Sequence, residues 1–451
     1  FNTCRIPSRE GDKVHMYPPA GNHHVLVLRR SCFFIVHATT ADGTPLSYQD
    51  IQSQLHAVVS ATGGGGKGRG AQECPVGALT ALGRDEWADA RDQLLLDGNG
   101  PLLERAQSAA LVVCLDDEAP MDRAGVARGL WHGNGRNRFF DKSVQLVVFA
   151  NGKAGMLNEH SLMDGGPVLR LADFMLKKTM RLEPSPETLA DAPTSPVTPP
   201  LQLYLGLSPA SRRAIANAEA SFDKLVNEHD VEVLMFPGYG SSTIKKFKMS
   251  PDGFVQMAIQ LAVFYMTGDV WGTYEPAQTR AFLHGRTACI RTVSVASVAW
   301  VRAMCKGDRL PTLERLELLR DAVKSHSMYA GQAAQGKDID RHFFGLSNVL
   351  QEGESAALFE DPAFSLSKRW RVSTSNVTHE QFDGWGWGEV VPDAGVGIAY
   401  MIKKRSMHFN VASLRRPEAW PRSLCHCLQE ALLNMQVLCE QAAVEAVGSK
   451  L

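Results

Sequence analysis

Residues 143–160 read SVQLVVFANGKAGMLNEH, two apolar runs that are joined by Asn151-Gly152. An Asn-Gly pair between apolar runs is the strongest short-range signal of a tight β-hairpin. The stretch therefore predicts two adjacent antiparallel strands, with His160 where the second strand leaves the sheet. Pro167 then begins a predicted helix. The apolar face of that helix carries Val168, Leu171, Ala172 and Met175.

His160 and Asp164 form an HxxxDG pattern, which has only three fixed positions and is by itself of low specificity. A packed core histidine is the more common role of a single histidine. A histidine with a pKa near ~6.5 can, however, take a proton from a hydroxyl or a thiol near neutral pH. Asp164 could bond the imidazole ring or hold the loop through a nearby arginine, and the spacing leaves both roles open.

The composition is that of an ordinary globular chain. It has 451 residues, of which 44% are apolar and 21% charged, with a formal net charge of −1. This length is enough for two or three domains with substantial cores. The low net charge provides no strong field for nucleic acid or an anionic membrane. No apolar run approaches the roughly 18–20 residues of a membrane span. We therefore expect no nucleic-acid partner and no membrane span.

Two features resemble binding motifs but lack the required context. The nine cysteines are scattered, and Cys425-His426-Cys427 has no second ligand pair for a zinc site. TGGGGKGRG at 62–70 lacks the Ser or Thr that follows the lysine of a phosphate-binding loop. We interpret the cysteines as reduced thiols of an intracellular protein and the glycine-rich stretch as a surface insertion.

The chain divides at a proline-rich connector. RLEPSPETLADAPTSPVTPPLQLYLGL at 181–207 is predicted to be extended, and Ser208-Pro209 begins a new helix. The prediction is two α/β domains, over residues 1–207 and 208–451. A long amphipathic helix is predicted at 421–447. Its apolar face carries Leu424, Leu428, Leu432, Met435 and Leu438.

A group of cations precedes a predicted helix start in the second half. Ser250-Pro251-Asp252 has the residue types of an N-cap, a first-turn proline and a first-turn acid. Lys245, Lys246 and Lys248 lie just before it. Cations at the positive end of a helix favour phosphate. Taken alone, the stretch fits a solvated basic turn better.

Three further stretches carry polar side chains beside predicted strands or aromatic residues. They are TYEPAQTRAFLHGRT (273–287), DRHFFGL (340–346), and VSTSNV (372–377) followed by GWGWGEVVPD (384–393). In VSTSNV, alternation places Ser373 and Ser375 on one face of a strand, where both could reach one ligand. Taken alone, Arg341 could form a surface ion pair and the tryptophans could belong to a core.

In this order, the five stretches resemble the carnitine/choline acyltransferases from the first residues to the last helix. The motifs are NEH…DG, YG…K…SPD, TYE…GRT, DRH…GL and STS…VVPD. Within the family, the chain most resembles the carnitine acetyltransferases. The resemblance implies two domains of similar topology, each a mixed sheet flanked by helices as in chloramphenicol acetyltransferase. It also implies an active-site tunnel between them that admits acyl-CoA and carnitine.

The resemblance implies roles for individual residues. His160 matches the catalytic base, and Asp164 matches an acid that pairs with the arginine corresponding to Arg286. Ser375 matches the hydroxyl near the developing oxyanion. The positions matching the carnitine site are Tyr274, Thr287, Arg341 and Ser373. The positions expected at coenzyme A are Lys245, Lys248 and Asp252.

The expected reaction is reversible transfer of an acetyl group between acetyl-CoA and L-carnitine, without a metal or prosthetic group. Trp385 stands where longer-chain members carry glycine, which implies a short acyl group. The alternatives are a medium-chain carnitine acyltransferase, a choline acetyltransferase and a non-catalytic acyl-CoA-binding protein. Arg341 and Thr287 argue against choline, and His160 with the serines argues against a non-catalytic role.

The chain also departs from the family pattern. Ser241 stands where a lysine is usual and Asn376 where a glutamine is usual, and the family's amino-terminal segment is missing. The first change weakens CoA binding unless Lys246 or Lys248 compensates. Ser449-Lys450-Leu451 is a peroxisomal address. We therefore expect a monomer that the peroxisomal import receptor recognises, with an additional mitochondrial form left open.

Overall fold

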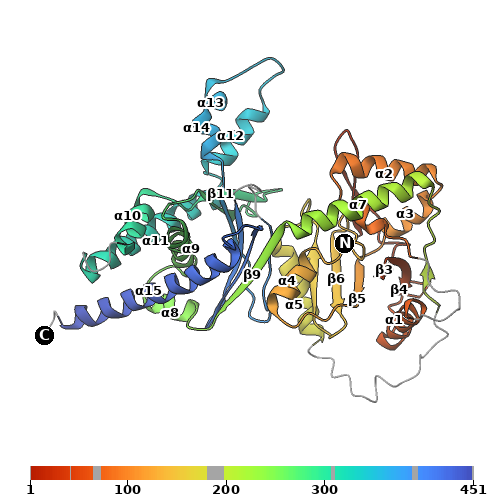
Figure 1. The fold of residues 1–451 in the computed structure, drawn as a ribbon, viewed down its shortest axis with the longest axis horizontal. Coiled ribbons are helices and arrows are strands. Elements are labelled where there is room, and N and C mark those ends of the chain that lie inside the picture. Colours follow the sequence, from red (N-terminus) through yellow and green to blue (C-terminus); the bar gives the residue numbers. More distant parts are fainter. Residues whose placement is uncertain are drawn as a thin grey trace. The chain divides into compact units, whose positions relative to one another are not determined.

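The computed structural model describes residues 2–40, 42–63, 73–179, 198–305, 310–388 and 395–448. They fall into two compact units, Phe1–Asn227 and Glu228–Leu451. Each unit is a mixed β-sheet flanked by helices (Figure 1). The predicted fold class is therefore confirmed, while the tunnel expected between the halves stays a prediction.

The sheet of the first unit has the strand order β7-β6-β5-β3-β4-β8. Its strands are β3 (His24–Arg29), β4 (Cys32–His37), β5 (Val112–Asp116), β6 (Val144–Phe149), β7 (Ala154–Asn158) and β8 (Leu201–Gln202). A separate hairpin pairs β1 (Thr3–Ile6) with β2 (Lys13–Met16). The helices are α1 (Tyr48–Thr62), the 3₁₀ helix η1 (Val76–Ala81), α2 (Arg84–Leu96), α3 (Gly100–Gln107), α4 (Arg123–Trp131), α5 (Gly165–Thr179) and α7 (Pro209–Asn227).

The hairpin predicted at 143–160 is present. β6 pairs antiparallel with β7, and Gly152 has φ 80°, in the left-handed region that tight hairpin turns require. β7 ends at Asn158, so His160 follows the strand end directly. α5 begins at Gly165, slightly earlier than predicted, and Pro167 lies in its first turn. Of its predicted apolar face only Ala172 is fully buried.

The division between the units falls after α7, whereas the sequence predicted it before this helix, at 207/208. α7 begins at Pro209 as predicted, but it packs against η1 and α2 of the first unit. Ile215, Ala218 and Phe222 of α7 are buried, which takes the helix into the first unit. The apolar face of α7 decides this placement, and no sequence signal shows which of two cores such a face will join.

The sheet of the second unit has the strand order β11-β10-β12-β13-β14-β9. Its strands are β9 (His229–Phe236), β10 (Thr273–Gln278), β11 (Thr287–Arg291), β12 (Val372–Asn376), β13 (Val396–Ile402) and β14 (Met407–Leu414). The helices are α8 (Ser241–Lys246), α9 (Pro251–Thr267), α10 (Val295–Cys305), α11 (Thr312–Ala334), α12 (Ile339–Asn348), α13 (Ala357–Glu360), α14 (Pro362–Ser367) and α15 (Trp420–Gly448).

The core of the second unit forms around α9. Residues 253–263 of this helix are all buried, and α9 packs against both α11 and α15. α15 matches the helix predicted at 421–447. All five apolar residues predicted for its inner face are buried. An apolar helix without a polar face is expected to lie inside a protein core, as α9 does.

The two sheets share one pairing pattern. From the β7 edge, the pairings in the first unit are antiparallel, parallel, parallel, antiparallel and antiparallel. From the β11 edge, the second unit has the same series. The similar topology predicted for the two domains is thus confirmed. The hairpin β10–β11 takes the place in the second unit that β6–β7 takes in the first.

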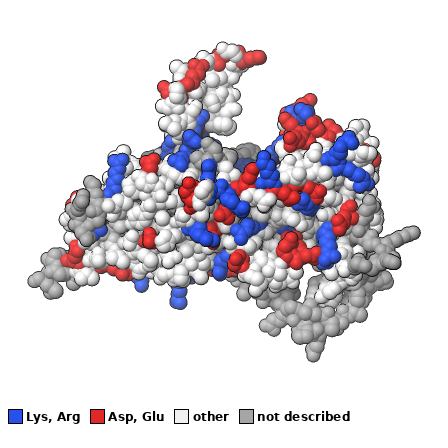
Figure 2. Space-filling model, in the orientation of Figure 1, with Lys and Arg blue, Asp and Glu red and all other residues white. Residues whose placement is uncertain are grey.

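Several predicted features lie outside the described residues. They are Ser449-Lys450-Leu451, most of the glycine-rich stretch 62–70, most of the proline-rich connector, and the VVPD motif at 390–393. Within the described part of the chain, no helix has the length and apolar character needed to cross a membrane. On the face shown in Figure 2, acidic and basic side chains are interspersed, in keeping with the net charge of −1.

Substitution of Gly135 tests the packing of α7. Gly135 has φ 69°, and a Cβ there would lie 2.5 Å from Cε1 of Phe222 in α7. Gly152 has φ 80° but open space around its Cβ position. Both Gly→Ala changes carry a left-handed backbone penalty of roughly 1–2 kcal/mol. Only Gly135→Ala adds a clash, which typically costs about 1–3 kcal/mol.

We therefore expect urea unfolding to show a larger loss of stability for Gly135→Ala than for Gly152→Ala. Equal losses would show that α7 does not pack over this glycine.

Candidate active site

His160 lies in the loop between β7 and α5, and 64% of its side chain is exposed. Its Nδ1 atom is 2.7 Å from the carbonyl oxygen of Met163. A carbonyl can only accept, so Nδ1 carries the proton of the neutral ring and Nε2 keeps its lone pair. The imidazole is therefore in the tautomer that can accept a proton at Nε2.

Asp164 lies close to this ring. Its Oδ1 is 3.6 Å from His160 Nδ1, which is beyond hydrogen-bond distance. The sequence left open whether Asp164 bonds the imidazole ring or holds the loop through an arginine. In the structure, the hydrogen bond from His160 Nδ1 goes to the carbonyl oxygen of Met163. Arg286 is exposed in the β10–β11 loop, and its pairing with Asp164 stays a prediction.

In the second unit, predicted ligand-binding hydroxyls share one face of the sheet. Tyr274 on β10 and Ser373 on β12 are register partners, and Ser375 lies two residues further along β12. Ser373 is 1% and Ser375 7% exposed. Among the residues that the structure describes, Ser373 Oγ has no hydrogen-bond partner. A buried hydroxyl without a partner calls for an explanation, and a polar group of a ligand would supply one.

Tyr274, Thr287 and Arg341 lie close together, while their role at the carnitine carboxylate stays a prediction. Arg341 Nε lies 3.2 Å from the carbonyl oxygen of Thr287, and Nη2 lies 3.4 Å from its hydroxyl. Asp338 caps α12 by accepting from the N–H of Arg341, and it also accepts from the N–H of Cys289 on β11. This carboxylate therefore fixes the start of α12, and Arg341 with it, against β11.

The ionisation of Tyr274 reflects these neighbours. Burial raises the pKa of Tyr274, while the charge of Arg341 and hydrogen bonds with Thr287 and Arg341 offset part of that rise. The phenol therefore stays protonated and able to donate. A guanidinium with two hydroxyls beside it has the chemistry of a carboxylate site.

The predicted helix start next to the lysines is present. Ser250 caps α9 by accepting from the N–H of Gly253, with Pro251 at the first helical position. Lys245 and Lys246 lie at the end of α8 and Lys248 in the turn before α9, and all three are exposed. The cations thus remain available to a phosphate, and their predicted role at coenzyme A stays a prediction.

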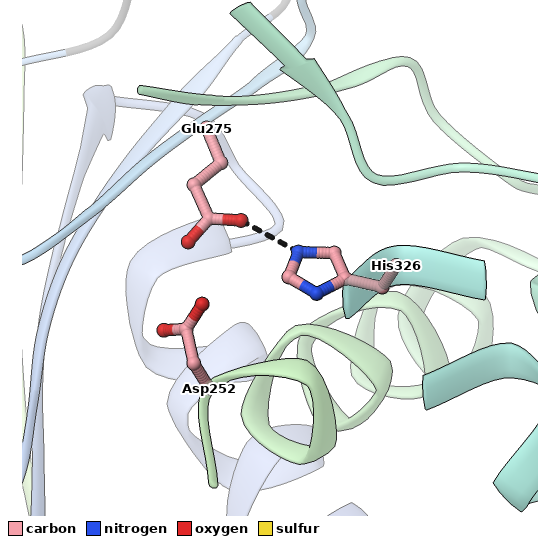
Figure 3. Close-up of side chains that lie close together, drawn as sticks. All are labelled: Asp252, Glu275 and His326. Carbon is pink, nitrogen blue, oxygen red and sulfur yellow. Dashed lines mark hydrogen bonds and ion pairs between the residues drawn. The ribbon is translucent and has the colours of Figure 1, made fainter. Parts of the chain in front are cut away.

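Asp252 is half-buried and lies beside the buried side chains of Glu275 and His326 (Figure 3). Its Oδ1 accepts from Asn376 Nδ2 at 3.0 Å and lies 2.8 Å from the hydroxyl of Tyr400. The same hydroxyl lies 3.0 Å from Glu275 Oε1. Glu275 Oε2 lies 2.7 Å from His326 Nε2. The side chains thus form a continuous chain from α9 across β13 and β10 to α11.

This geometry requires an additional proton. The single hydroxyl proton of Tyr400 can serve only one of the two carboxyl groups, so the other short contact needs a protonated carboxyl. Burial, and then the charge of Asp252, raise the pKa of Glu275 to about 7. Burial alone would lower the pKa of His326, but its hydrogen bond and charge interaction with Glu275 raise it overall. Glu275 and His326 therefore retain protons more readily than in an unfolded chain.

The cluster also braces β12. Gln256 of α9 donates from Nε2 to the hydroxyls of Thr374 and Tyr400, both at 2.9 Å. Thr374 in turn donates to the carbonyl oxygen of Tyr274 at 2.8 Å. Thr374 faces the core, so Ser373 and Ser375 are held facing the other way. The core-facing contacts thereby set the direction of the two serines.

Asp252, Glu275 and His326 are the one set of three potential metal-ligating side chains found in the described part of the chain. Their ligand atoms lie within 4.8 Å of one another. Each of these groups already has a hydrogen-bond partner within the protein. The expectation of a metal-free enzyme stays a prediction.

Trp385 is half-buried in the segment after β12. Its indole Nε1 donates to the carbonyl oxygen of Tyr400 at 3.1 Å, and its ring centre lies 5.7 Å from that of Trp387. The indole is therefore fixed against β13, the strand next to β12.

The sequence model of one protein family, described as Choline/Carnitine o-acyltransferase, matches residues 1–430. The chain belongs to this family. It is 36% identical over 431 residues to "Carnitine O-acetyltransferase, mitochondrial" of Saccharomyces cerevisiae, with 92% of this chain and 62% of the relative covered. To "Carnitine O-acetyltransferase" of Rattus norvegicus it is 32% identical over 459 residues, covering 97% and 70%. The chain thus spans less than two thirds of the yeast relative.

A third relative of this chain is named for a longer acyl group. "Carnitine O-palmitoyltransferase 2, mitochondrial" of Xenopus tropicalis is 32% identical over 440 residues, covering 96% of this chain and 64% of the relative. Among solved structures, chloramphenicol acetyltransferase aligns with a TM-score of 0.27 and 7% identity, over 46% of this chain and 89% of that one. The last likeness is too slight to carry an argument, so the family assignment stands on sequence.

Some residues of this candidate site were missed by sequence reasoning. Met163 acts through its backbone carbonyl, for which a sequence holds no signal. Glu275 belongs to the TYE motif, but only the fold shows that it turns to the core while Tyr274 turns to the opposite face of the sheet. The sequence analysis assigned no role to His326 or Tyr400, because no motif or spacing links either residue to Glu275.

The pH dependence of stability tests the protonated cluster. A pKa raised from 4.5 to about 7 means that folded Glu275 binds more protons than unfolded Glu275 in this interval. Its contribution to stability is therefore full below the unfolded pKa and is lost as pH rises through the folded one. The shift corresponds to roughly 3 kcal/mol. The raised pKa of His326 acts in the same direction.

We expect the unfolding free energy to fall less steeply between about pH 4.5 and 7 in Glu275→Gln than in the wild type. Glu317→Gln removes an exposed carboxylate that pairs with Arg320, and it serves as the matched control with a wild-type slope. Parallel curves for wild type and Glu275→Gln would contradict the raised pKa.

Proposed function

We propose that this chain catalyses the reversible transfer of a short acyl group, above all acetyl, between coenzyme A and the hydroxyl of L-carnitine. The observation that carries the proposal is the grouping of Arg341, Thr287 and Tyr274 beside the buried serines of β12. Membership of the acyltransferase family and relatives named carnitine O-acetyltransferase support it.

The carboxylate of the acceptor substrate would occupy this group of residues. Carnitine is a zwitterion, and its carboxylate suits a fixed guanidinium flanked by hydroxyl donors. Choline lacks a carboxylate and would leave Arg341 without a substrate partner. The hydroxyl of Ser373 has no partner among the described residues and lies on the same face as Tyr274, so it offers a further polar contact. Carnitine is therefore the acceptor that the residues favour.

His160 would act as the general base through Nε2. It takes the hydroxyl proton of carnitine as the oxygen forms a bond to the thioester carbonyl carbon. When the tetrahedral intermediate collapses, the carbon–sulfur bond breaks and the imidazolium returns its proton to the sulfur of coenzyme A. The carboxylate of Asp164, 3.6 Å from Nδ1, stabilises the imidazolium between these steps. General base catalysis of this kind is typically worth ~10²–10⁴-fold.

Ser375 would donate a hydrogen bond to the oxyanion of that intermediate. Such donors help most when they are fixed before the reaction, and the buried position of Ser375 on a central strand fixes it. The reaction so written needs no metal or prosthetic group, and coenzyme A enters only as a substrate.

The exposed lysines would bind the phosphates of coenzyme A. Ser241 stands where the family usually has a lysine, and its hydroxyl instead donates to the carbonyl oxygen of Lys403. The turn after Lys403 brings exposed Lys404 and Arg405 to the start of α8, where Ser242 N–H bonds the carbonyl of Lys404. These cations, with Lys246 and Lys248, could replace the missing charge.

Substitution of His160 tests the reaction and the base together. We expect the wild-type chain to release free thiol from acetyl-CoA only when L-carnitine is present. In His160→Ala this rate should fall by about 10²–10⁴-fold, because Nε2 no longer takes the proton. Choline in place of L-carnitine should give little release.

His426→Ala is the matched control, because His426 also has an acid four residues on and is 72% exposed. It should keep wild-type activity. Carnitine-dependent release that survives in His160→Ala would refute the assignment of the base, and its absence from the wild type would refute the reaction.

The acyl length is tested at Trp385, because a medium-chain acyltransferase is the competing proposal. The glycine of Trp385→Gly would empty the space of a fixed indole. We expect the ratio of kcat/KM for octanoyl-CoA over acetyl-CoA to rise at least about tenfold, since a few buried methylenes discriminate by that much.

Trp387→Gly, which empties the neighbouring indole position, should leave this ratio nearly unchanged. An unchanged ratio in Trp385→Gly would mean that another part of the chain limits acyl length. Peroxisomal import through Ser449-Lys450-Leu451 and a monomeric state remain part of this proposal, to be tested separately.

A further inference from the structure

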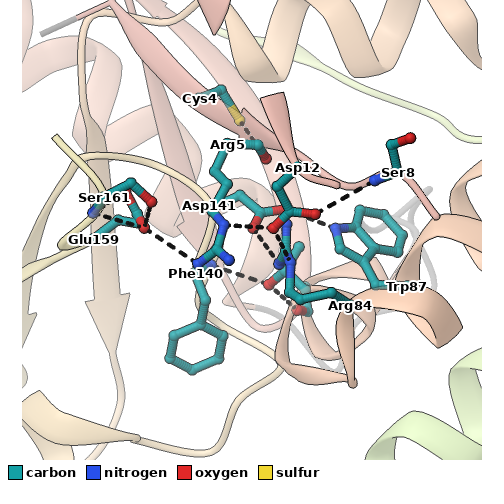
Figure 4. Close-up of polar contacts among 12 residues, drawn as sticks. Cys4, Arg5, Ser8, Asp12, Arg84, Trp87, Phe140, Asp141, Glu159 and Ser161 are labelled. Atoms are coloured by element: carbon teal, nitrogen blue, oxygen red, sulfur yellow. Dashed lines mark hydrogen bonds and ion pairs between the residues drawn. The ribbon is translucent and has the colours of Figure 1, made fainter. Parts of the chain in front are cut away.

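The loop that carries His160 is closed by a residue outside the proposed chemistry. Both carboxylate oxygens of Glu159 lie 3.0 Å from the backbone N–H of Ser161, and Oε1 also accepts from the Ser161 hydroxyl (Figure 4). His160 is the residue between them, so these bonds enclose its backbone in a tight turn. Only 12% of the Glu159 side chain is exposed.

Arg5 ties Glu159 to the folded body of the first unit. Its Nη1 lies 3.5 Å from Glu159 Oε1, and its Nε donates to Asp12 Oδ2 at 2.5 Å. The same Asp12 oxygen accepts from Arg84 of α2 at 2.6 Å. One guanidinium thus joins the His160 loop to the β1–β2 hairpin and, through Asp12, to α2.

The network ends on a buried carboxylate. Arg84 Nη1 donates to Asp141 Oδ1 at 2.7 Å, and the indole of Trp87 donates to Asp141 Oδ2 at 2.6 Å. Asp141 and Trp87 are almost fully buried. Buried hydrogen bonds that share partners strengthen one another and make the groups that form them more rigid. The far end of the network is therefore rigid, and Glu159 is its contact with the loop.

We propose that Glu159 is a positioning residue for His160 and that Arg5 holds Glu159 in place. The inference rests on the proposed function, in which His160 Nε2 takes the proton of carnitine. Two constraints act on His160: Glu159 fixes the backbone through Ser161, and the Met163 carbonyl fixes the ring through Nδ1. The Met163 contact depends on the path of the loop, so releasing Glu159 also loosens the ring.

A more mobile His160 is expected to slow the chemical step rather than to weaken substrate binding. A reacting group displaced by about 1 Å can lower the rate about 10²-fold. Glu159 bonds Ser161 and pairs with Arg5, both within the first unit, whereas the residues proposed for carnitine and coenzyme A belong to the second, so substrate affinity should not change. We expect kcat of Glu159→Ala to fall about ten- to hundredfold, with KM for both substrates within about twofold of wild type.

Graded variants separate the two parts of the proposal. Glu159→Gln keeps an oxygen that can accept from Ser161 but loses the charge that Arg5 binds, so its kcat should fall less than that of Glu159→Ala. Arg5→Gln should resemble Glu159→Gln. Asp89→Asn is the matched control, because it breaks the exposed two-bond pair with Arg9 in the same β1–β2 region without touching the loop. It should keep wild-type kcat.

A spectroscopic measurement gives a readout that does not depend on activity. In ¹⁵N-histidine-labelled protein, the ring nitrogens of neutral His160 report which one carries the proton, and His160→Ala identifies their signals. We expect a protonated Nδ1 in the wild type and in Asp89→Asn, and a mixture of both tautomers in Glu159→Ala.

The outcomes are distinguishable from a failure of the proposed function. An unchanged tautomer and an unchanged kcat in Glu159→Ala would overturn the positioning role, whatever the reaction. Equal losses of kcat in Glu159→Ala and Asp89→Asn would overturn it as well, because they would indicate general destabilisation. Tautomer loss in Glu159→Ala would uphold it even if His160→Ala showed that the proposed reaction is wrong.

Discussion

The second unit depends on the need to satisfy the polar groups of its central strand. β12 reads Val-Ser-Thr-Ser-Asn, yet its first four residues are buried between two neighbouring parallel strands. A buried hydroxyl without a partner costs about 1–3 kcal/mol. On the core face, Thr374 and Asn376 find partners in Gln256 and Asp252. On the other face, Ser373 has none among the described residues, and the proposed function assigns its hydroxyl to a ligand.

The same constraint explains why an otherwise apolar core holds Asp252, Glu275, His326 and Tyr400. A single carboxylate in that position would be unpaired and costly, whereas four groups can share protons and hydrogen bonds. The cluster bears on the proposed chemistry through β12 alone, by holding Ser373 and Ser375 toward the ligand face. The cluster orients the two serines of β12 and takes no part in the proposed reaction.

The two units use one topology for different purposes. In the first, the loop after the β6–β7 hairpin carries an exposed histidine with a fixed tautomer. In the second, hydrogen bonds hold the loop after β10–β11: Gln260 of α9 donates to the carbonyl oxygen of Thr292, and Ser294 and Ser297 bond each other at the start of α10. Both units therefore hold a loop in the corresponding position of the fold. The side chains in each loop decide whether it can take part in catalysis.

The sequence by itself determined the elements whose signals are local. The Asn151-Gly152 hairpin, the Ser250-Pro251 helix start, the alternation of Ser373 and Ser375, and the inner face of α15 all follow from short-range turn chemistry or periodicity. Motif order likewise identified the family and brought Tyr274, Thr287 and Arg341 forward as one group.

Only the tertiary structure decided which distant groups meet. It placed α7 in the first unit, assigned the ring of His160 to the backbone carbonyl of Met163, and joined Glu275 to His326 across two elements. It also linked Arg5 to Glu159. These contacts depend on side-chain direction and on backbone carbonyls, which carry no residue-type signal, so composition and spacing could not predict them.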